Sequence, residues 1–247
     1  TSLTAPRNSR IGDIISSQIP SAGSTLSVEH LADRAVMALR DGADLTPKPG
    51  LADGRGPGTR RDITREMLHA SAEALRPAFE RCVAAARKLD TGVELRAELG
   101  RIGRAGEAAM LRATDGVATH RGSLWSLGLL CAGAANAAST GRIARGAAKL
   151  AQIPDPAARL EGDAPSDEAE VSHRFQVRGA VGEARAGFPH ITFLALPTLL
   201  HAREHGLDEP TARLHVLLTL MARLDDTCVL DRGGMTGLIS VQSSAQS

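Results

Sequence analysis

The stretch RGSLWSLGLLCAGAANAA, residues 121–138, carries apolar or small side chains at nearly every position. A helix formed by these residues has no face suited to water, which is typical of a helix buried within a protein. Its most apolar part, residues 124–138, is shorter than the roughly 20 residues that a helix needs to cross a bilayer. The stretch therefore predicts the buried central helix of a globular domain.

The segments on both sides of this stretch also have helical periodicity, and no run of alternating β-branched residues predicts a strand. Pro77 is expected to kink or split the second helix. The expected helices are a first one from a Ser27 cap to about residue 39, a long one capped by Asp62, and then residues 95–113, 170–186, 191–204 and 209–225, the last capped by Asp208. Residues 154–168 are expected to form an exposed loop. The sequence thus predicts an all-α fold, with a single compact multi-helix domain over residues 27–238 between a flexible arm (1–26) and a flexible tail (239–247) that frays from Gly233.

Composition excludes several classes of protein. The 247 residues suit one domain, and a net charge of +1 creates no field that would recruit nucleic acid or an anionic membrane. Aromatic residues are 2 % of the chain, which argues against base-stacking surfaces for single strands. Cys82, Cys131 and Cys228 form no CxxC pair, as expected of reduced thiols, and residues 1–26 lack the apolar core of a signal peptide. We expect a cytoplasmic protein without nucleic-acid or membrane partners.

The loop TPKPGLADGRGPGTRRD, residues 46–62, combines prolines, glycines without side chains, and charged residues of both signs. Its prolines fix the backbone, its glycines allow close approach of a ligand, and its cations and carboxylates can hold phosphate and metal. The alternative is a polar connection between helices that ends in an Asp62 cap. The residues alone leave both interpretations open.

Acidic residues in unusual places are a second signal. Leu214, Leu218 and Met221 form an apolar stripe that Asp225 continues, with Asp226 on its flank. A carboxylate on such a stripe must be paired, protonated or metal-bound, unless the helix ends earlier and both aspartates are solvated. Taken singly, Glu107 would be a surface residue paired with Arg104, His120 a cap residue and Arg232 a loop charge.

Three known motifs are rejected. The chain has no GxxxxGK[ST] phosphate loop, and GRIGRAG at residues 100–106 lies within helical periodicity, where its glycines favour close helix packing. HAREH at residues 201–205 fits the HxxEH of inverted zinc peptidases. We prefer a basic last helical turn ahead of Gly206, which needs no metal.

Six boxes together resemble one family. Across about residues 28–238, the chain resembles triphosphoribosyl-dephospho-CoA synthases in the order of six sequence motifs. These are TPKPGLAD, RRDI, RIGRAGEAAM, TDGVATHRGSLWSLG, RGAVGEARAGFP and LMARLDDTCVLDRGG. The resemblance implies a transferase that joins the ribose of ATP to the 2′-hydroxyl of 3′-dephospho-CoA and expels adenine. The product is the prosthetic-group precursor for the acyl-carrier subunit of malonate decarboxylase or citrate lyase, and the THRG box inclines toward the malonate system.

The resemblance also implies site residues and partners. Glu107, Glu183 and Asp226 are the expected catalytic acids, with base, ligand and stabiliser unassigned among them. The residues expected to bind nucleotide are Lys48, Arg101, His120, Arg121, Arg178 and Arg232, and those expected to hold Mg²⁺ are Asp53, Asp62, Glu107 and Asp226. ATP and 3′-dephospho-CoA are the expected partners, and a homodimer stays open.

Four positions depart from the pattern of the family. Ala118 stands where family members generally have Asn, Val181 where they have a second Arg, and Cys228 and Asp231 where they have Asn and His. Arg178, one helical turn before Val181, is placed to supply the missing guanidinium. Two rival functions therefore stay open: a magnesium-dependent hydrolase of nucleotide N-glycosidic bonds, and a non-catalytic nucleotide-binding partner.

Overall fold

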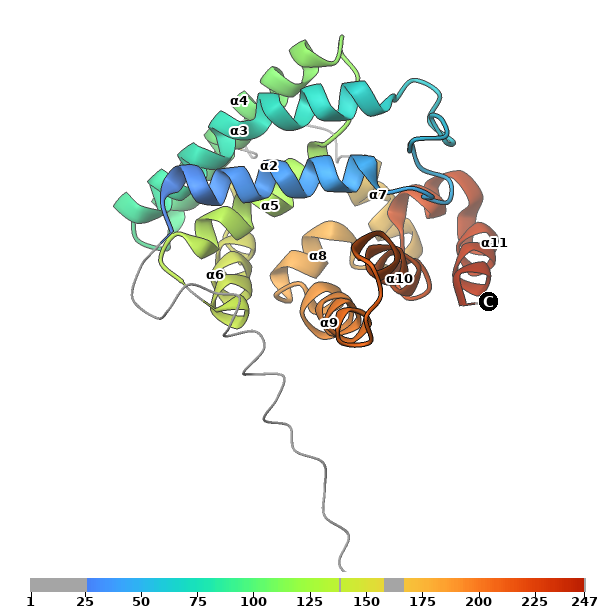
Figure 1. Ribbon diagram of the computed structural model, residues 1–247. Coiled ribbons are helices and arrows are strands. Elements are labelled where there is room, and N and C mark those ends of the chain that lie inside the picture. Colours follow the sequence, from blue (N-terminus) through green and yellow to red (C-terminus); the bar gives the residue numbers. More distant parts are fainter. Residues whose placement is uncertain (1–25, 138, 158–166, 247) are drawn as a thin grey trace, which may run out of the picture.

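The computed structural model describes residues 26–137, 139–157 and 167–246, and every regular element within them is a helix (Figure 1). The all-α prediction is confirmed. In chain order the helices are α2 (Val28–Asp44), α3 (Arg65–Lys88), α4 (Val93–Ala113), α5 (Arg121–Ala134), α6 (Thr140–Gln152), α7 (Asp167–Phe175), α8 (Gly179–Arg185), the π-helix η2 (His190–Ala195), α9 (Leu196–Glu204), α10 (Glu209–Met221) and α11 (Thr227–Gln246). Within the described residues, no helix is both long and apolar enough to cross a membrane. The expected arm, residues 1–26, falls almost entirely outside the described residues.

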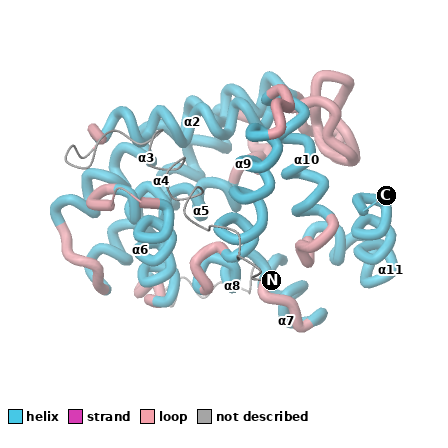
Figure 2. The backbone as a smooth tube through the Cα atoms, turned by 60° about the horizontal axis from the view of Figure 1, so that its bottom comes forward, coloured by secondary structure: helices cyan, strands magenta, loops and turns pink. Residues whose placement is uncertain are grey.

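Helix α5 lies inside the bundle, as its sequence predicted. Helices α2, α3 and α4 pack side by side above it, and α6 and α8 cover it from below (Figures 1 and 2). Leu124 and Leu129 of α5 are buried in the main core with residues of α3 and α4, among them Phe79 and Ile102. The helix ends at Ala134, four residues earlier than expected.

Small residues let these helices approach closely. A Cβ atom at Gly133 of α5 would lie 2.5 Å from the carbonyl oxygen of Ile143 in α6, and one at Gly106 of α4 would lie 3.0 Å from Cβ of Ala78 in α3. Any larger side chain would push the helices apart. The packing role that the sequence suggested for the GRIGRAG glycines is confirmed at Gly106.

The second half of the chain departs from the predicted boundaries. The expected helix 170–186 is broken into α7 and α8, where Gln176 (φ 56°) and Gly179 (φ 57°) adopt left-handed backbone angles. The expected helix 191–204 begins as the π-helix η2, and α10 stops at Met221. Helix α6, from Thr140 to Gln152, was not predicted.

The expected fraying tail is helical instead. Helix α11 continues to Gln246 with one break in its backbone, at Gly234 (φ 58°, ψ −164°). Leu238 is buried beside Leu230 and Val171, and these three residues form a small core apart from the main one. The tail was mispredicted because its glycine and serine content outweighed the contribution of this apolar contact.

The start of α3 also differs from the prediction. Thr64, not Asp62, caps the helix, since its side chain accepts the backbone N–H of Met67. Pro77 does not split the helix, which continues from Arg65 to Lys88. Packing of its neighbours Ala78 and Phe79 in the core holds the helix together where one backbone hydrogen bond is missing.

Candidate functional site

The loop between α2 and α3 is organised around a buried Lys48–Asp53 contact. The backbone N–H of Lys48 donates to Asp53 Oδ2 at 2.8 Å, and the N–H of Arg55 donates to Asp53 Oδ1 at 2.8 Å. The Arg55 guanidinium adds an ion pair at 2.8 Å. The Arg55 side chain, followed by these two N–H groups, holds the pKa of Asp53 far below its usual range, so this buried carboxyl stays ionised.

Lys48 is buried as well, and its ammonium group closes the end of α2. It donates to the carbonyl oxygens of Gly42 at 2.5 Å and Ala43 at 3.2 Å, which are orphan acceptors of the last helical turn. Burial lowers its pKa, an effect that the charges of Asp53 and Asp44 oppose. Lys48 is therefore part of the folded structure of the loop and not a solvated charge on its surface. Lys48 still borders a shallow cavity of about 400 Å³ with Gly50, Asp53 and other loop residues.

His120 meets this loop from the start of α5. Its Nδ1 lies 2.8 Å from the hydroxyl of Ser71 in α3, and Thr119 donates its own hydroxyl to Ser71 at 2.8 Å. Ser71 accepts from Thr119 and can donate its own hydroxyl proton to Nδ1, an arrangement in which the imidazole proton lies on Nε2. The chain Thr119–Ser71–His120 therefore fixes the orientation of the imidazole and is compatible with a proton on Nε2.

The histidine is also held neutral. Burial, followed by the nearby Lys48 cation, lowers the pKa of His120 to about 4. Nε2 has no hydrogen-bond partner within the described residues, and no side-chain polar atom there is both fully buried and unpartnered. Nε2 must therefore reach an accessible surface, where it presents an uncharged N–H donor. Sequence analysis selected His120 but missed Ser71, which the sequence presents as one more small residue of a helix.

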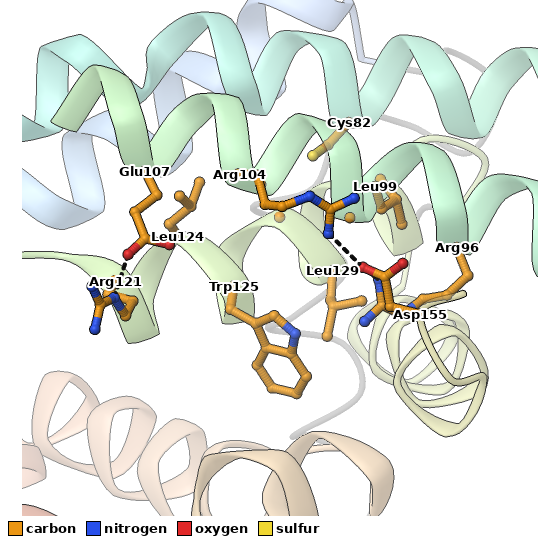
Figure 3. A pocket seen from close by; sticks show the side chains of 13 residues that line it. Cys82, Arg96, Leu99, Arg104, Glu107, Arg121, Leu124, Trp125, Leu129 and Asp155 are labelled. Carbon is orange, nitrogen blue, oxygen red and sulfur yellow. Dashed lines mark hydrogen bonds and ion pairs between the residues drawn. The ribbon is translucent and has the colours of Figure 1, made fainter. Parts of the chain in front are cut away.

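A second cavity, of about 210 Å³, lies between α4 and α5 (Figure 3). Glu107 and Arg121 border it, and Arg121 Nε donates to Glu107 Oε1 at 2.5 Å. The expected partner of Glu107 was Arg104, one turn before it. Arg104 instead donates to Asp155 at 3.0 Å. Arg121 directly follows His120 in the chain, so the first turn of α5 adjoins both the Ser71–His120 contact and this cavity.

Asp155 is a buried carboxylate that sequence analysis missed. It lies in the segment predicted as an exposed loop, of which residues 158–166 are outside the described part of the chain. Arg96 lies 3.5 Å from its carboxylate in addition to Arg104. Gly100 leaves the room for it, because a Cβ atom there would lie 1.9 Å from Asp155 Oδ2. This network fixes the end of the cavity that lies away from Glu107.

Glu183 is engaged by a histidine that the sequence did not single out. Its two carboxylate oxygens contact the backbone N–H and Nδ1 of His190, each at 2.8 Å. The pair joins α8 to the first turn of η2, and π-helical turns are frequent at functional sites. Glu183 therefore orients the His190 ring, with the other ring nitrogen facing away from the carboxylate.

The two neighbouring aspartates near the end of the chain are now distinguished. Because α10 ends at Met221, Asp225 lies beyond the apolar stripe and is exposed, so the spacing argument for it was wrong. Asp226 caps α11, where its Oδ1 accepts the N–H groups of Cys228 at 2.8 Å and Val229 at 3.0 Å. Arg232, one turn later, donates to Thr59 Oγ1 at 3.0 Å and so ties α11 to the glycine-rich loop.

Two of the predicted nucleotide-binding arginines lie away from both cavities. Arg101 is exposed and forms an ion pair with Glu98 at 2.6 Å. Arg178 is exposed at the start of α8. Neither lines the loop cavity or the α4–α5 cavity. Their nucleotide-binding role stays a prediction.

The four predicted metal ligands do not form a ready-made ion site. Asp62 pairs with Arg60, whose hydrogen bond lowers the pKa of Asp62 to about 2, while Asp53, Glu107 and Asp226 have the partners described above. The described residues contain no group of three or more His, Cys, Asp or Glu that could hold a metal ion. A Mg²⁺ ion that arrives with a triphosphate needs only one or two carboxylates, and ionised Asp53 and Asp62 satisfy that requirement in donor chemistry.

Comparison of the sequence with known proteins shows the family of the chain. The family model CitG, described as ATP:dephospho-CoA triphosphoribosyl transferase, matches residues 28–247. The chain belongs to this family. A probable 2-(5″-triphosphoribosyl)-3′-dephosphocoenzyme-A synthase of Stutzerimonas stutzeri (strain A1501) is 48 % identical over 236 residues, which are 94 % of this chain and 79 % of the relative. The synthase of Klebsiella pneumoniae is 45 % identical over 224 residues, 88 % of this chain and 78 % of the relative. No solved structure matches.

The residues that the family model matches include all the elements of the candidate site. The match extends over the loop, both cavities and α11, and it confirms the transferase class predicted from the six boxes. The four departures from the family pattern differ in their exposure to solvent. Ala118 packs against the main core, whereas Val181, Cys228 and Asp231 are exposed.

Proposed function

We propose that this protein transfers the triphosphoribosyl group of ATP to the 2′-hydroxyl of 3′-dephospho-CoA and releases adenine. The observation that supports the proposal most is the family match over residues 28–247, which includes every element of the candidate site. The product would be the prosthetic-group precursor for the acyl-carrier subunit of malonate decarboxylase or of citrate lyase.

The reaction balances without an external reagent. The bond between C1′ of the ATP ribose and N9 of adenine breaks, and a bond from C1′ to the 2′-oxygen of dephospho-CoA forms. The proton of the attacking hydroxyl ends on the departing adenine. Positive charge develops at C1′ as in glycoside hydrolysis, so a nearby carboxylate lowers the barrier.

The acids and bases of this chain can be ranked for the proton transfer. His120, with a pKa near 4, is too weak a base at neutral pH and serves as an uncharged hydrogen-bond donor. The Glu183–His190 pair has the arrangement of an oriented base, with a carboxylate fixing one ring nitrogen and the other left to accept a proton. Glu107 forms an ion pair with Arg121 at the edge of the α4–α5 cavity, where its carboxylate can accept hydrogen bonds from a bound substrate.

Mg²⁺ would enter with the triphosphate and neutralise part of its charge. Asp53 and Asp62 on the glycine-rich loop would hold it, and Lys48 and Arg232 add positive charge to the same region. The loop holds Asp53 in place before any ligand arrives, because three separate groups donate to its carboxylate.

Adenine release tests the proposal. Purified protein is incubated with ATP and Mg²⁺, with and without 3′-dephospho-CoA, and free adenine is followed by chromatography. We expect release only when dephospho-CoA is present, together with a product whose mass equals dephospho-CoA plus the triphosphoribosyl group. Release without dephospho-CoA would instead identify a hydrolase, and nucleotide binding without any release would identify a non-catalytic partner.

A further inference from the structure

The cavity between α4 and α5 has a glycine where packing does not require one. A Cβ atom added at Gly103 would have no heavy atom of residues 26–137, 139–157 or 167–246 within 4 Å, so among these residues the missing side chain opens into the cavity. Glycine inside a helix costs about 1 kcal/mol relative to alanine. Gly100 and Gly106 on the same helix are explained by contacts with Asp155 and Ala78, but Gly103 has no such neighbour in the part of the chain that the structure describes. Its effect is to keep the cavity open.

The cavity walls suit a flat aromatic ring. Leu99, Leu124 and Leu129 provide apolar surface, and the indole of Trp125 is half-buried at the open side (Figure 3). Indole faces stack on heterocycles, with a contribution of about 1–3 kcal/mol per base in proteins that bind single strands. The apolar part of the cavity therefore has the shape and chemistry of a ring-binding slot.

The remaining edge of the cavity is polar. The Glu107 carboxylate accepts hydrogen bonds, and the Arg121 guanidinium, whose side chain is 64 % exposed, has donors to spare beyond its bond to Glu107. Adenine presents a donor at its exocyclic amino group and acceptors at its ring nitrogens. An acceptor and a donor side by side match that edge.

The volume limits what the cavity can hold. About 210 Å³ is below the roughly 300–1,000 Å³ of sites that enclose a whole small molecule. One ring system can enter while sugar and phosphates stay outside. We propose that the α4–α5 cavity binds the adenine base of a nucleotide substrate, with the ring against Trp125 and its polar edge at the Glu107–Arg121 pair. The choice of a nucleotide rests on the proposed function, in which both ATP and dephospho-CoA carry adenine.

The chain contains one tryptophan, so its fluorescence reports on this cavity alone. Wild-type protein is titrated separately with adenine, ATP and 3′-dephospho-CoA while Trp125 emission is recorded. We expect adenine and at least one nucleotide to change the emission. If adenine and ATP change the emission but dephospho-CoA does not, the cavity binds the base of ATP. If adenine and dephospho-CoA change it but ATP does not, the cavity binds the base of dephospho-CoA.

Variants that fill the cavity with side chains of increasing size test the proposal. Gly103→Ala and Gly103→Leu add volume where there is room, and Ala108→Leu on the exposed face of the same helix is the matched control. We expect thermal stability to be equal or higher in Gly103→Ala, and base affinity to fall with side-chain size, at least tenfold in Gly103→Leu. Ala108→Leu should bind as the wild type does.

Two results would overturn the assignment. One is an unchanged Trp125 emission with all three compounds, and the other is wild-type affinity in a folded Gly103→Leu protein. Should Gly103→Leu fail to fold, the affinity of Gly103→Ala decides, with unaltered binding counting against the proposal. Failure of the proposed function would look different, because adenine could still bind in the cavity of a protein that releases no adenine from ATP.

Discussion

Ser71 Oγ lies 2.8 Å from Nδ1 of His120, and both residues are buried although they are 49 positions apart in the chain. The contact joins α3 to the start of α5. Thr119 donates to the same hydroxyl, so the histidine is fixed in orientation, and donation from Ser71 to Nδ1 would leave its proton on Nε2. A neutral donor of this kind contributes hydrogen bonding to a ligand without adding a charge beside Lys48.

The pKa of His120 predicts how stability depends on pH. The folded pKa is about 4, below the unfolded value of about 6.5, so the unfolded chain binds more protons between these values. The stabilisation from the neutral histidine is complete above about pH 6.5 and is lost as the pH falls toward 4, by up to about 3 kcal/mol. Chemical denaturation at several pH values measures this, and His120→Gln should flatten the slope. Equal slopes in both proteins would contradict the assigned burial.

The tautomer of His120 predicts an asymmetry between two substitutions. Glutamine can place an amide N–H near the position of Nε2, whereas asparagine can place one only near Nδ1. We expect His120→Gln to retain more of the ATP affinity than His120→Asn, by about tenfold, or roughly 1.4 kcal/mol. Calorimetric titration with ATP checks the order, and ¹⁵N spectra of the wild type should show the proton on Nε2. The reverse order would place the proton on Nδ1.

Lys48 is predicted to matter for stability as well as for binding. Lys48→Met removes two hydrogen bonds to the end of α2 and leaves the buried carbonyl of Ala43 unpaired, which typically costs about 1–3 kcal/mol. Arg61→Met is the matched control, since it removes an exposed cation of the same loop. Thermal melting of both variants, each compared with the wild type, gives the result. A Lys48→Met protein as stable as the control would show that the capping contacts contribute nothing.

The variants Asp226→Asn and Asp225→Asn are predicted to differ in enzymatic activity. Asparagine caps a helix about as well as aspartate, so Asp226→Asn should keep the melting temperature and lose only the charge. We expect a rate of adenine release about a hundredfold lower, or roughly 2.7 kcal/mol in transition-state free energy. Asp225→Asn, exposed beyond α10, should be close to the wild type in both measurements. A fast Asp226→Asn enzyme would leave that residue with its capping role alone.

Removal of divalent metal should stop the reaction. Because the triphosphate carries several negative charges and the described carboxylates form no cluster of their own, we expect the ion to enter with ATP. EDTA should abolish adenine release, and excess Mg²⁺ should restore it. The circular dichroism spectrum should be unchanged in EDTA, because none of the contacts described for the fold involves a metal ion. Activity that survives chelation would remove Mg²⁺ from the mechanism.

The sequence predicted local features better than distant contacts. The Ser27 and Asp208 caps were confirmed, because a capping side chain and the N–H it accepts are three residues apart. The ends of α5 and α10 were misplaced, because tertiary packing, not propensity, decides where an apolar helix stops. Ser71, Asp155 and His190 were missed for a common reason. Each gains its role from a residue on another element, and a single sequence gives no sign of that contact.

The small core of Val171, Leu230 and Leu238 has a consequence for motion. It is separate from the main core, so α7 and α11 form a unit that can open at a lower free-energy cost than the α2–α6 bundle. Amide hydrogens of α11 should therefore exchange with solvent earlier than those of α3. Such an opening would move Asp226 and Arg232 away from Thr59 of the loop, while the contacts of Lys48 and His120, which involve neither helix, would remain. The hydrogen bond from Arg232 to Thr59 would then be the contact that holds this unit against the loop until it opens.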